Sequence, residues 1–189
     1  MTRVLVFAGS ARRVSLNKKL ARVAAEAVRG AGGAATLIDL ADFALPLYHG
    51  DLEVESGIPA PVRELAALVR SHAALMIASP ENNTSVSALL KNTLDWISRI
   101  KDEPAFAGKV AALLAASTGH FGGVRGLYHL RAILNSLGVD VLAQQFVLPR
   151  ANTAFDTEGR LVDALQAEQV NRLAARLVDV AARLGESPG

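Results

Sequence analysis

The stretch RVLVFAGSARRVSLN, residues 3–17, indicates the fold of this 189-residue chain. It starts with a continuous apolar run, Arg3 to Gly9, which is typical of a strand buried on both faces of a parallel sheet. After Ser15, a suitable N-cap, apolar residues recur at helical spacing until the glycine-rich residues 30–33. A buried strand joined to an amphipathic helix by a short glycine-containing loop predicts a parallel α/β domain.

The same alternation continues along the chain. Four more strands are predicted, at Ala34 to Leu40, Ala73 to Ser79, Lys109 to Ser117 and Val139 to Leu148. Helices are predicted at Pro59 to Ser71, from Ser85 or Ser87 to about Lys101, at Gly122 to Gly138 and from about Asp163 to Leu184. Residues 41–59, rich in turn formers, are expected to form a long loop. This order predicts an α/β fold with a doubly wound, five-stranded parallel sheet and helices on both faces.

Length and composition restrict the class of protein. The length fits one domain, residues 1–185, followed by a short tail, residues 186–189, that is expected to fray. An apolar fraction of 51% and a net charge of +2 exclude a disordered chain. Because the chain has no cysteine, disulfides, thiolate nucleophiles and cysteine-held metal centres are excluded, and its four histidines show no metal-ligand spacing.

Neither charge nor hydropathy suggests a macromolecular or membrane partner. A net charge of +2 with 5% aromatic residues predicts no nucleic-acid partner. The longest apolar runs, such as Val110 to Ala116, are too short to span a bilayer. Polar residues follow the first apolar run too soon for a secretion signal. We therefore expect a cytoplasmic protein with no membrane partner.

The loops after the first, third and fourth strands are expected to carry the site. Open parallel sheets bind ligands at the carboxyl ends of their strands, where the strand order reverses. The first loop, GSARRVSLN (residues 9–17), offers a glycine, hydroxyl groups and a helix N-terminus, all suited to an anion. Arg12 or Arg13 can add charge-assisted hydrogen bonds to a phosphate. The glycine spacings of the dinucleotide fingerprint and of the P-loop are both absent.

The other two loops suit a flat, polar ligand. SPENNTS (residues 79–85) has many backbone donors and acceptors, and STGHFGGVR (residues 117–125) has glycines that allow close approach. His120 invites a catalytic role, but a lone loop histidine is more often a surface residue. Since no carboxylate pair, nucleophile–base pair or metal cluster occurs in the three loops, the site is predicted to hold a phosphorylated cofactor that carries the reactivity.

The helix after the second loop contains the sequence LLKNTLDW, residues 89–96. Lys91 and Asp95 are four residues apart on one helix face and are expected to pair. Trp96 is expected to serve packing or an interface rather than the cofactor.

Together the three loops resemble the NADPH-dependent FMN reductase family of flavodoxin-like proteins, in particular its chromate- and quinone-reducing branch. The resemblance covers Val4 to about Phe146 and rests on GSARRVSLN, SPENNTSVSALLKNTLDW (residues 79–96) and STGHFGGVRGLYHLR (residues 117–131). It implies a flavodoxin-like fold, FMN as cofactor and NADPH or NADH as co-substrate. It also implies a set of FMN-binding residues: Ser10, Arg12, Ser15, Leu16 and Asn17 around the phosphate, Pro80, Glu81, Asn82 and Asn83 along the isoalloxazine, and Ser117, Gly119 and Gly122 on its other side.

The resemblance also bears on assembly and on affinity. It implies a homodimer or homotetramer in which Arg125 and Tyr128 match interface positions, with an ordinary helix surface as the alternative. Asn82 stands where relatives usually carry a tyrosine. Losing that aromatic contact is expected to raise the FMN dissociation constant roughly tenfold to a hundredfold, so that FMN still binds.

The reaction implied by the resemblance is a two-step hydride transfer. Hydride passes from NAD(P)H to the flavin and then to a quinone, azo, flavin or metal-oxyanion acceptor that enters the same space, a ping-pong mechanism. The hydride step requires no protein acid or base. Two alternatives stay open. A flavodoxin-like FMN electron carrier would be strongly acidic, unlike this chain, and a flavin-free module on the same fold would leave the phosphate loop without a purpose.

Overall fold

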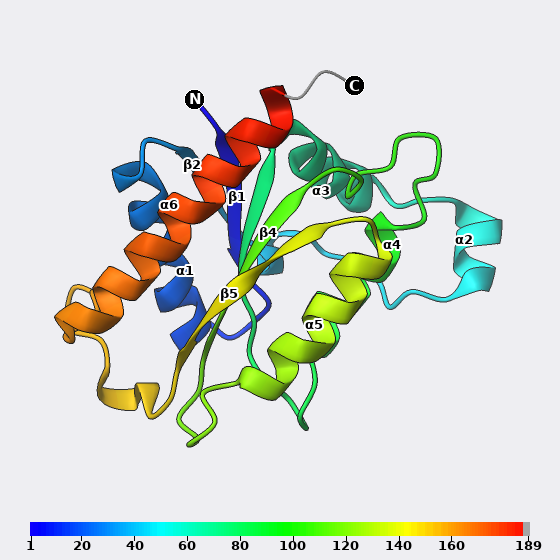
Figure 1. Ribbon diagram of the computed structural model, residues 1–189. Coiled ribbons are helices and arrows are strands. Elements are labelled where there is room, and N and C mark those ends of the chain that lie inside the picture. The colour runs from blue at the N-terminus through cyan, green and yellow to red at the C-terminus, as the bar shows by residue number, and fades with distance from the viewer. Residues whose placement is uncertain (187–189) are drawn as a thin grey trace.

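The five apolar runs form one all-parallel sheet, shown in Figure 1, in a computed structural model that describes residues 1–186. The strands are β1 (Arg3–Ala8), β2 (Ala34–Asp39), β3 (Ala74–Ala78), β4 (Val110–Ala116) and β5 (Asp140–Leu148), and they lie in the order β2-β1-β3-β4-β5. β3 and β4 are buried throughout, and β1 is buried after its first residue. The predicted doubly wound sheet and its five strands are confirmed.

Helices cover both faces of the sheet (Figure 1). One face packs against α1 (Leu16–Gly30) and α6 (Ala164–Glu186), and the other against α3 (Ala60–Ser71), α4 (Ala88–Ile97) and α5 (Val124–Ser136). Because side chains alternate along a strand, Val4 and Val6 join the first core while Leu5 and Phe7 join the second. The three central strands, β1, β3 and β4, are therefore apolar on both faces, which explains their continuous apolar runs in the sequence.

The strand order reverses between β1 and β3. The helix α1 leaves β1 over one face, whereas α3 returns the chain to β3 over the other face. The two strands end together, since Ala8 pairs with Ala78 and the Gly9 N–H donates to the Ala78 carbonyl at 3.0 Å. Their following loops diverge from this point, which is where doubly wound sheets bind ligands.

The region predicted as a single loop, residues 41–59, is partly helical. A 3-10 turn spans Leu40–Asp42, and α2 (Gly50–Ser56) projects from the body of the molecule in Figure 1. The His49 ring caps α2 by accepting from the Leu52 N–H at 3.2 Å, and Gly57, with φ of 70°, ends it. The prediction was wrong here because α2 buries none of its residues, so it leaves no apolar periodicity in the sequence.

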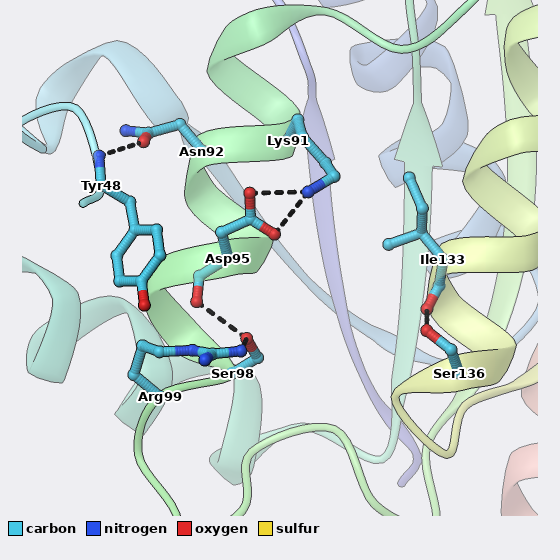
Figure 2. A network of polar contacts seen from close by, with 8 residues as sticks. All are labelled: Tyr48, Lys91, Asn92, Asp95, Ser98, Arg99, Ile133 and Ser136. Atoms are coloured by element: carbon cyan, nitrogen blue, oxygen red, sulfur yellow. Dashed lines mark hydrogen bonds and ion pairs between the residues drawn. The ribbon is translucent and has the colours of Figure 1, made fainter. Parts of the chain in front are cut away.

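The segment just before α2 is hydrogen-bonded to side chains of α4, as Figure 2 shows for Tyr48 and Asn92. The Asn92 side chain accepts from the Tyr48 N–H at 2.8 Å, and the Trp96 indole N–H donates to the Pro46 carbonyl at 2.8 Å. Trp96 is fully buried and meets the Tyr48 ring edge-on, which confirms its predicted packing role. The predicted pair is also confirmed, since Lys91 Nζ lies 2.6 Å from Asp95.

Two further expectations concerned membrane-spanning segments and the C-terminal end of the chain. No helix within residues 1–186 is long and apolar enough to cross a membrane. The last helix begins at Ala164 and continues to Glu186, slightly beyond its predicted end. The rest of the tail that was expected to fray, residues 187–189, lies outside the described residues.

Candidate functional site

A cleft of about 580 Å³ lies at the carboxyl ends of β1, β3 and β4, between the loops in which the site was expected. This volume lies within the usual range for small-molecule sites. The cleft brings together nine of the predicted residues, which are Ser10, Arg12, Ser15, Leu16, Asn17, Pro80, Glu81, Asn82 and Ser117. Three predicted residues, Asn83, Gly119 and Gly122, do not line it.

One end of the cleft is suited to an anion. It is formed by the N-terminus of α1, whose N-cap Ser15 accepts from the Lys18 N–H at 3.3 Å. The first turn of α1 carries no acidic residue that would oppose a bound anion. Arg12 lies on the same side, is exposed, and has no hydrogen-bond or ion-pair partner for its guanidinium among the described residues. An unpaired arginine beside a helix N-terminus is a fitting site for a phosphate.

Asn17 fixes the helix to the sheet. Its buried amide donates to the Ala116 carbonyl at 2.9 Å and accepts from the Ala116 N–H at 2.9 Å. The side chain predicted to bind phosphate is therefore already committed to the last residue of β4. Because the Asn17 side chain has this structural role, its presence in the phosphate loop does not require a bound ligand.

Ser87 joins the first loop to α4. Its hydroxyl donates to the Gly9 carbonyl at 2.5 Å and accepts from the Leu90 N–H at 3.1 Å, so Ser87 rather than Ser85 is the N-cap of α4. A Cβ atom on Gly9 would lie 3.0 Å from the Leu90 side chain. Gly9 thus allows β1 to end directly against α4, on the floor of the cleft.

The loop after β3 reverses through a tight turn beside the cleft. Asn82 and Ser85 exchange backbone hydrogen bonds of 2.9 and 3.0 Å around Asn83, with φ of 49°, and Thr84, with φ of 64°. Two central residues of positive φ are typical of a type I′ turn. Asn83 is exposed at its tip, which explains why it does not line the cleft.

Thr84→Gly is expected to stabilise the protein by about 0.5–1 kcal/mol, because a β-branched residue is strained at positive φ by more than glycine costs in chain entropy. The melting temperature should rise by about 1–4 °C. Asn83→Gly is the matched control. Asparagine tolerates this conformation, so we expect little gain from it. Equal losses of stability in both variants would show that Thr84 is unstrained.

Glu81 is held by the start of α5. Its carboxylate accepts from the backbone N–H groups of Arg125 and Gly126, at 2.9 and 3.2 Å, and from the Arg125 guanidinium. Burial opposes ionisation of the carboxyl group, but these donors and the charge of Arg125 outweigh burial and hold the pKa of Glu81 below its usual value. Glu81 is therefore ionised at neutral pH.

The depressed pKa predicts a pH-dependent effect of Glu81→Gln on stability. The ionised carboxylate stabilises the fold above the pKa that Glu81 has in the unfolded chain, and this contribution is lost as the pH falls through the lower folded-state pKa. Denaturation curves should therefore show the variant less stable than the wild type near pH 7, with the gap closing in acid below about pH 4. A gap that stays constant from pH 7 to pH 3 would contradict this assignment.

The loop after β4 packs against the segment after β5. The Arg150 N–H donates to the Gly119 carbonyl at 3.3 Å, and a Cβ atom on Gly122 would lie 2.9 Å from the Pro149 nitrogen. These two glycines therefore approach the chain after β5 instead of a ligand. The same packing brings Asn152 into the cleft, a residue that the sequence analysis did not identify.

His120 lies outside the cleft. It is exposed, and its ring packs edge-on against the neighbouring Phe121 at 5.5 Å between centroids. Arg12 and Glu81 are the only ionisable residues among the described residues that line the cleft. Within residues 1–186 no group of three histidine or acidic side chains could hold a metal ion.

Comparison with known proteins identifies the family. Residues 2–153 match the family described as NADPH-dependent FMN reductase. The chain belongs to the NADPH-dependent FMN reductase family. Over 128 residues it is 43% identical to an NAD(P)H-dependent FMN reductase of Pseudomonas aeruginosa, covering 67% of this chain and 68% of that protein. It is 35% identical over 189 residues to an NADPH:quinone oxidoreductase of Arabidopsis thaliana, covering 97% and 94%.

The structure of this FMN reductase family member is similar to that of FerB, a flavoenzyme NAD(P)H:(acceptor) oxidoreductase from Paracoccus denitrificans. The TM-score is 0.84 with 26% sequence identity, and the match covers 97% of this chain and 98% of that one. The expected flavodoxin-like fold, the NAD(P)H-dependent reductase class and the cofactor FMN are confirmed. The family therefore favours the reductase over the electron carrier and the flavin-free module.

The cleft of this reductase fits FMN by its own chemistry. The α1 N-terminus and Arg12 suit the phosphate, whereas Pro80, Asn82 and Ser117, together called the slot, line the cleft with uncharged groups that suit a flat ring. Ala88 and Leu89 add apolar surface to the same cleft. The cleft thus combines a cationic donor for the phosphate with uncharged groups for the ring, and the charge of Glu81 is paired with Arg125.

Proposed function

We propose that this protein takes hydride from NADPH or NADH and passes it to a small-molecule acceptor by a ping-pong mechanism in the cleft at the end of β1, β3 and β4. Quinones, azo compounds, free flavins and metal oxyanions are the acceptor classes. FMN, when bound, supplies the hydride chemistry. The observation that carries the proposal is the combination of an unpaired Arg12 at the α1 N-terminus with a neutral slot in one cleft.

The residues of the cleft would then bind and orient. Arg12, Ser10, Ser15 and the backbone N–H groups at Leu16 and Asn17 would hold the phosphate. Pro80, Asn82 and Ser117 would lie along the isoalloxazine, with Asn83, Gly119 and Gly122 further out on the same two loops.

Proton transfer by a side chain has no place in this mechanism. The Arg12 guanidinium offers only hydrogen-bond donors and no acceptor, and the Glu81 carboxylate is occupied by four hydrogen bonds to Arg125 and Gly126. The protein's contribution would be orientation and backbone donors that favour negative charge on the reduced ring. This agrees with the absence of a nucleophile–base pair among the described cleft residues.

Initial rates test the shared cleft. NADPH would be varied at several fixed concentrations of a soluble benzoquinone, with FMN-loaded protein. Parallel double-reciprocal lines are expected, because oxidised nicotinamide must leave before the quinone enters. Intersecting lines would contradict the ping-pong mechanism.

We also propose that the protein is a cytoplasmic homodimer or homotetramer, with Arg125 and Tyr128 at the interface. Large aromatic side chains are exposed on the first turns of α5 and in the loop just before it, since Tyr128 is 60% and Phe121 59% accessible. Tyr128→Glu is expected to weaken assembly at least tenfold, as measured by light scattering over a concentration series. The matched control is Leu165→Glu, at an exposed apolar position on α6. A monomeric wild type, or equal effects of both variants, would contradict this interface.

A further inference from the structure

Helix α5 begins without a cap of its own. Its N-cap position is Gly123, in a left-handed conformation with φ of 95°, and no side chain of the helix's own segment caps the first turn. The Arg125 and Gly126 N–H groups instead donate to Glu81, which belongs to the loop after β3. One carboxylate from a distant loop thus replaces the missing N-cap.

The same carboxylate forms an ion pair with the helix it caps. Glu81 Oε1 accepts from Arg125 Nε at 2.8 Å and also from Nη2, while Oε2 takes the backbone donors. The Glu81 side chain is only 8% exposed, and the Arg125 guanidinium also lies over the Phe121 ring at 4.9 Å. The Arg125 side chain is 48% exposed, so only the carboxylate side of the pair is shielded from water, but a forked contact of this kind is more directional than a single-contact surface ion pair.

The two segments approach too closely for side chains to separate them. A Cβ atom on Gly126 would lie 3.0 Å from the Ser85 carbonyl oxygen and 3.3 Å from Glu81 Cβ. A Cβ atom on Gly123 would lie 2.8 Å from Ala115 Cβ of β4 and 3.8 Å from Glu81 Cβ. The start of α5 is therefore packed directly on the loop after β3 around Glu81 Cβ, and on the end of β4.

We propose that Glu81 is a positioning residue that clamps the loop after β3 to the start of α5 and so sets the position of the Pro80–Asn82 backbone along the flavin slot. This inference rests on the proposed function. Pro80 and Asn82 flank Glu81 directly, and all three line the cleft. Glu81 acts through Arg125 and Gly126, so its role differs from that of Arg12, which would touch the cofactor itself. Apart from the clamp, the loop is closed by its own turn from Asn82 to Ser85 and is joined to α5 by a hydrogen bond between the Ser85 hydroxyl and the His129 ring at 2.9 Å.

The clamp has two consequences that can be separated experimentally. In flavin-free protein, the Arg125 and Gly126 amides should exchange with solvent at least about tenfold faster once their acceptor is removed. In flavin binding, a loosened slot should weaken FMN and riboflavin equally, by about tenfold each, because the slot contacts the ring that both share. Loss of a phosphate ligand would weaken FMN alone.

The test compares Glu81→Ala and Glu81→Gln with the wild type and with Glu26→Gln as the control. Glu26 also forms a close ion pair, with Arg29 at 2.6 Å, on the exposed side of α1 outside the cleft. Hydrogen exchange is followed at residues 125 and 126, and FMN and riboflavin are titrated by fluorescence quenching. Both Glu81 variants should show faster exchange and equally weakened binding of the two flavins, with Glu81→Gln less affected because it keeps one acceptor oxygen. Glu26→Gln should show neither change.

Three outcomes would overturn the proposal. Unchanged exchange at residues 125 and 126 would show that the carboxylate does not cap α5. Unchanged flavin affinities with a lowered melting temperature would show a role in stability alone. Weakened FMN with unchanged riboflavin would place Glu81 at the phosphate. A wild type that binds neither flavin would instead overturn the proposed function, and the exchange measurement distinguishes this case because it needs no flavin.

Discussion

Replacing Arg12 by alanine is expected to weaken FMN binding by about 10- to 100-fold. A hydrogen bond between charged partners contributes about 1.5–3 kcal/mol, and each 1.4 kcal/mol changes the dissociation constant tenfold. Arg12 lines the cleft beside the α1 N-terminus, and its guanidinium has no partner among the described residues, so it is free for the phosphate. Titration of the flavin-free protein with FMN measures the effect.

Two controls make the Arg12 prediction specific. Arg13 is also exposed but does not line the cleft, so Arg13→Ala should leave the FMN dissociation constant within about threefold of the wild type. Riboflavin lacks the phosphate, so its affinity should be the same for Arg12→Ala as for the wild type. Equal losses from both arginine variants, or an equal loss for riboflavin, would show that Arg12 does not bind the phosphate.

The largest effect on stability is expected from Asn17→Leu. This substitution removes both hydrogen bonds to Ala116 and leaves a buried N–H and a buried carbonyl group without partners. Each such group costs about 1–3 kcal/mol, which gives a loss of about 2–6 kcal/mol in the free energy of unfolding. For a protein of this size, the melting temperature should fall by about 4–24 °C.

The control for this prediction is Asn135→Leu. Asn135 is exposed on α5, and a surface substitution of this kind should change stability by less than about 0.5 kcal/mol. Thermal unfolding by circular dichroism in flavin-free protein measures both variants without any contribution from ligand binding. A similar, small effect of both substitutions would contradict the assigned role of the Asn17 amide.

The sequence predicts the layered fold because its main signal is burial. Strands such as β3 and β4 are covered on both faces, so every residue in them is apolar, and the helices that cover them repeat at helical spacing. The cleft then follows from strand order alone. Elements that bury little, such as α2, give no such signal, which is why residues 50–56 were expected to be part of a loop.

Contacts between loops were harder to predict from the sequence. Asn152 reaches the cleft only because Ala151 and Arg150 pack on the loop after β4, an arrangement with no local sequence pattern. Glu81 was expected to lie along the isoalloxazine, and nothing in the sequence indicated that its side chain caps a helix 44 residues further along the chain. The N-cap role of Ser87 was easier to predict from the sequence, since a serine before an apolar helix is a known N-cap signal. It was one of the two starts considered for α4.

The measurement that tests the central claim most directly is the visible absorption spectrum of the protein with FMN, recorded anaerobically before and after addition of NADPH. Protein that is colourless after purification would first be titrated with FMN. We expect two flavin bands from a bound cofactor and their bleaching by NADPH or NADH without any partner protein. Protein that binds no FMN on titration, or bound flavin that neither nucleotide bleaches, would contradict the assignment of this cleft to an NAD(P)H-dependent flavin reductase.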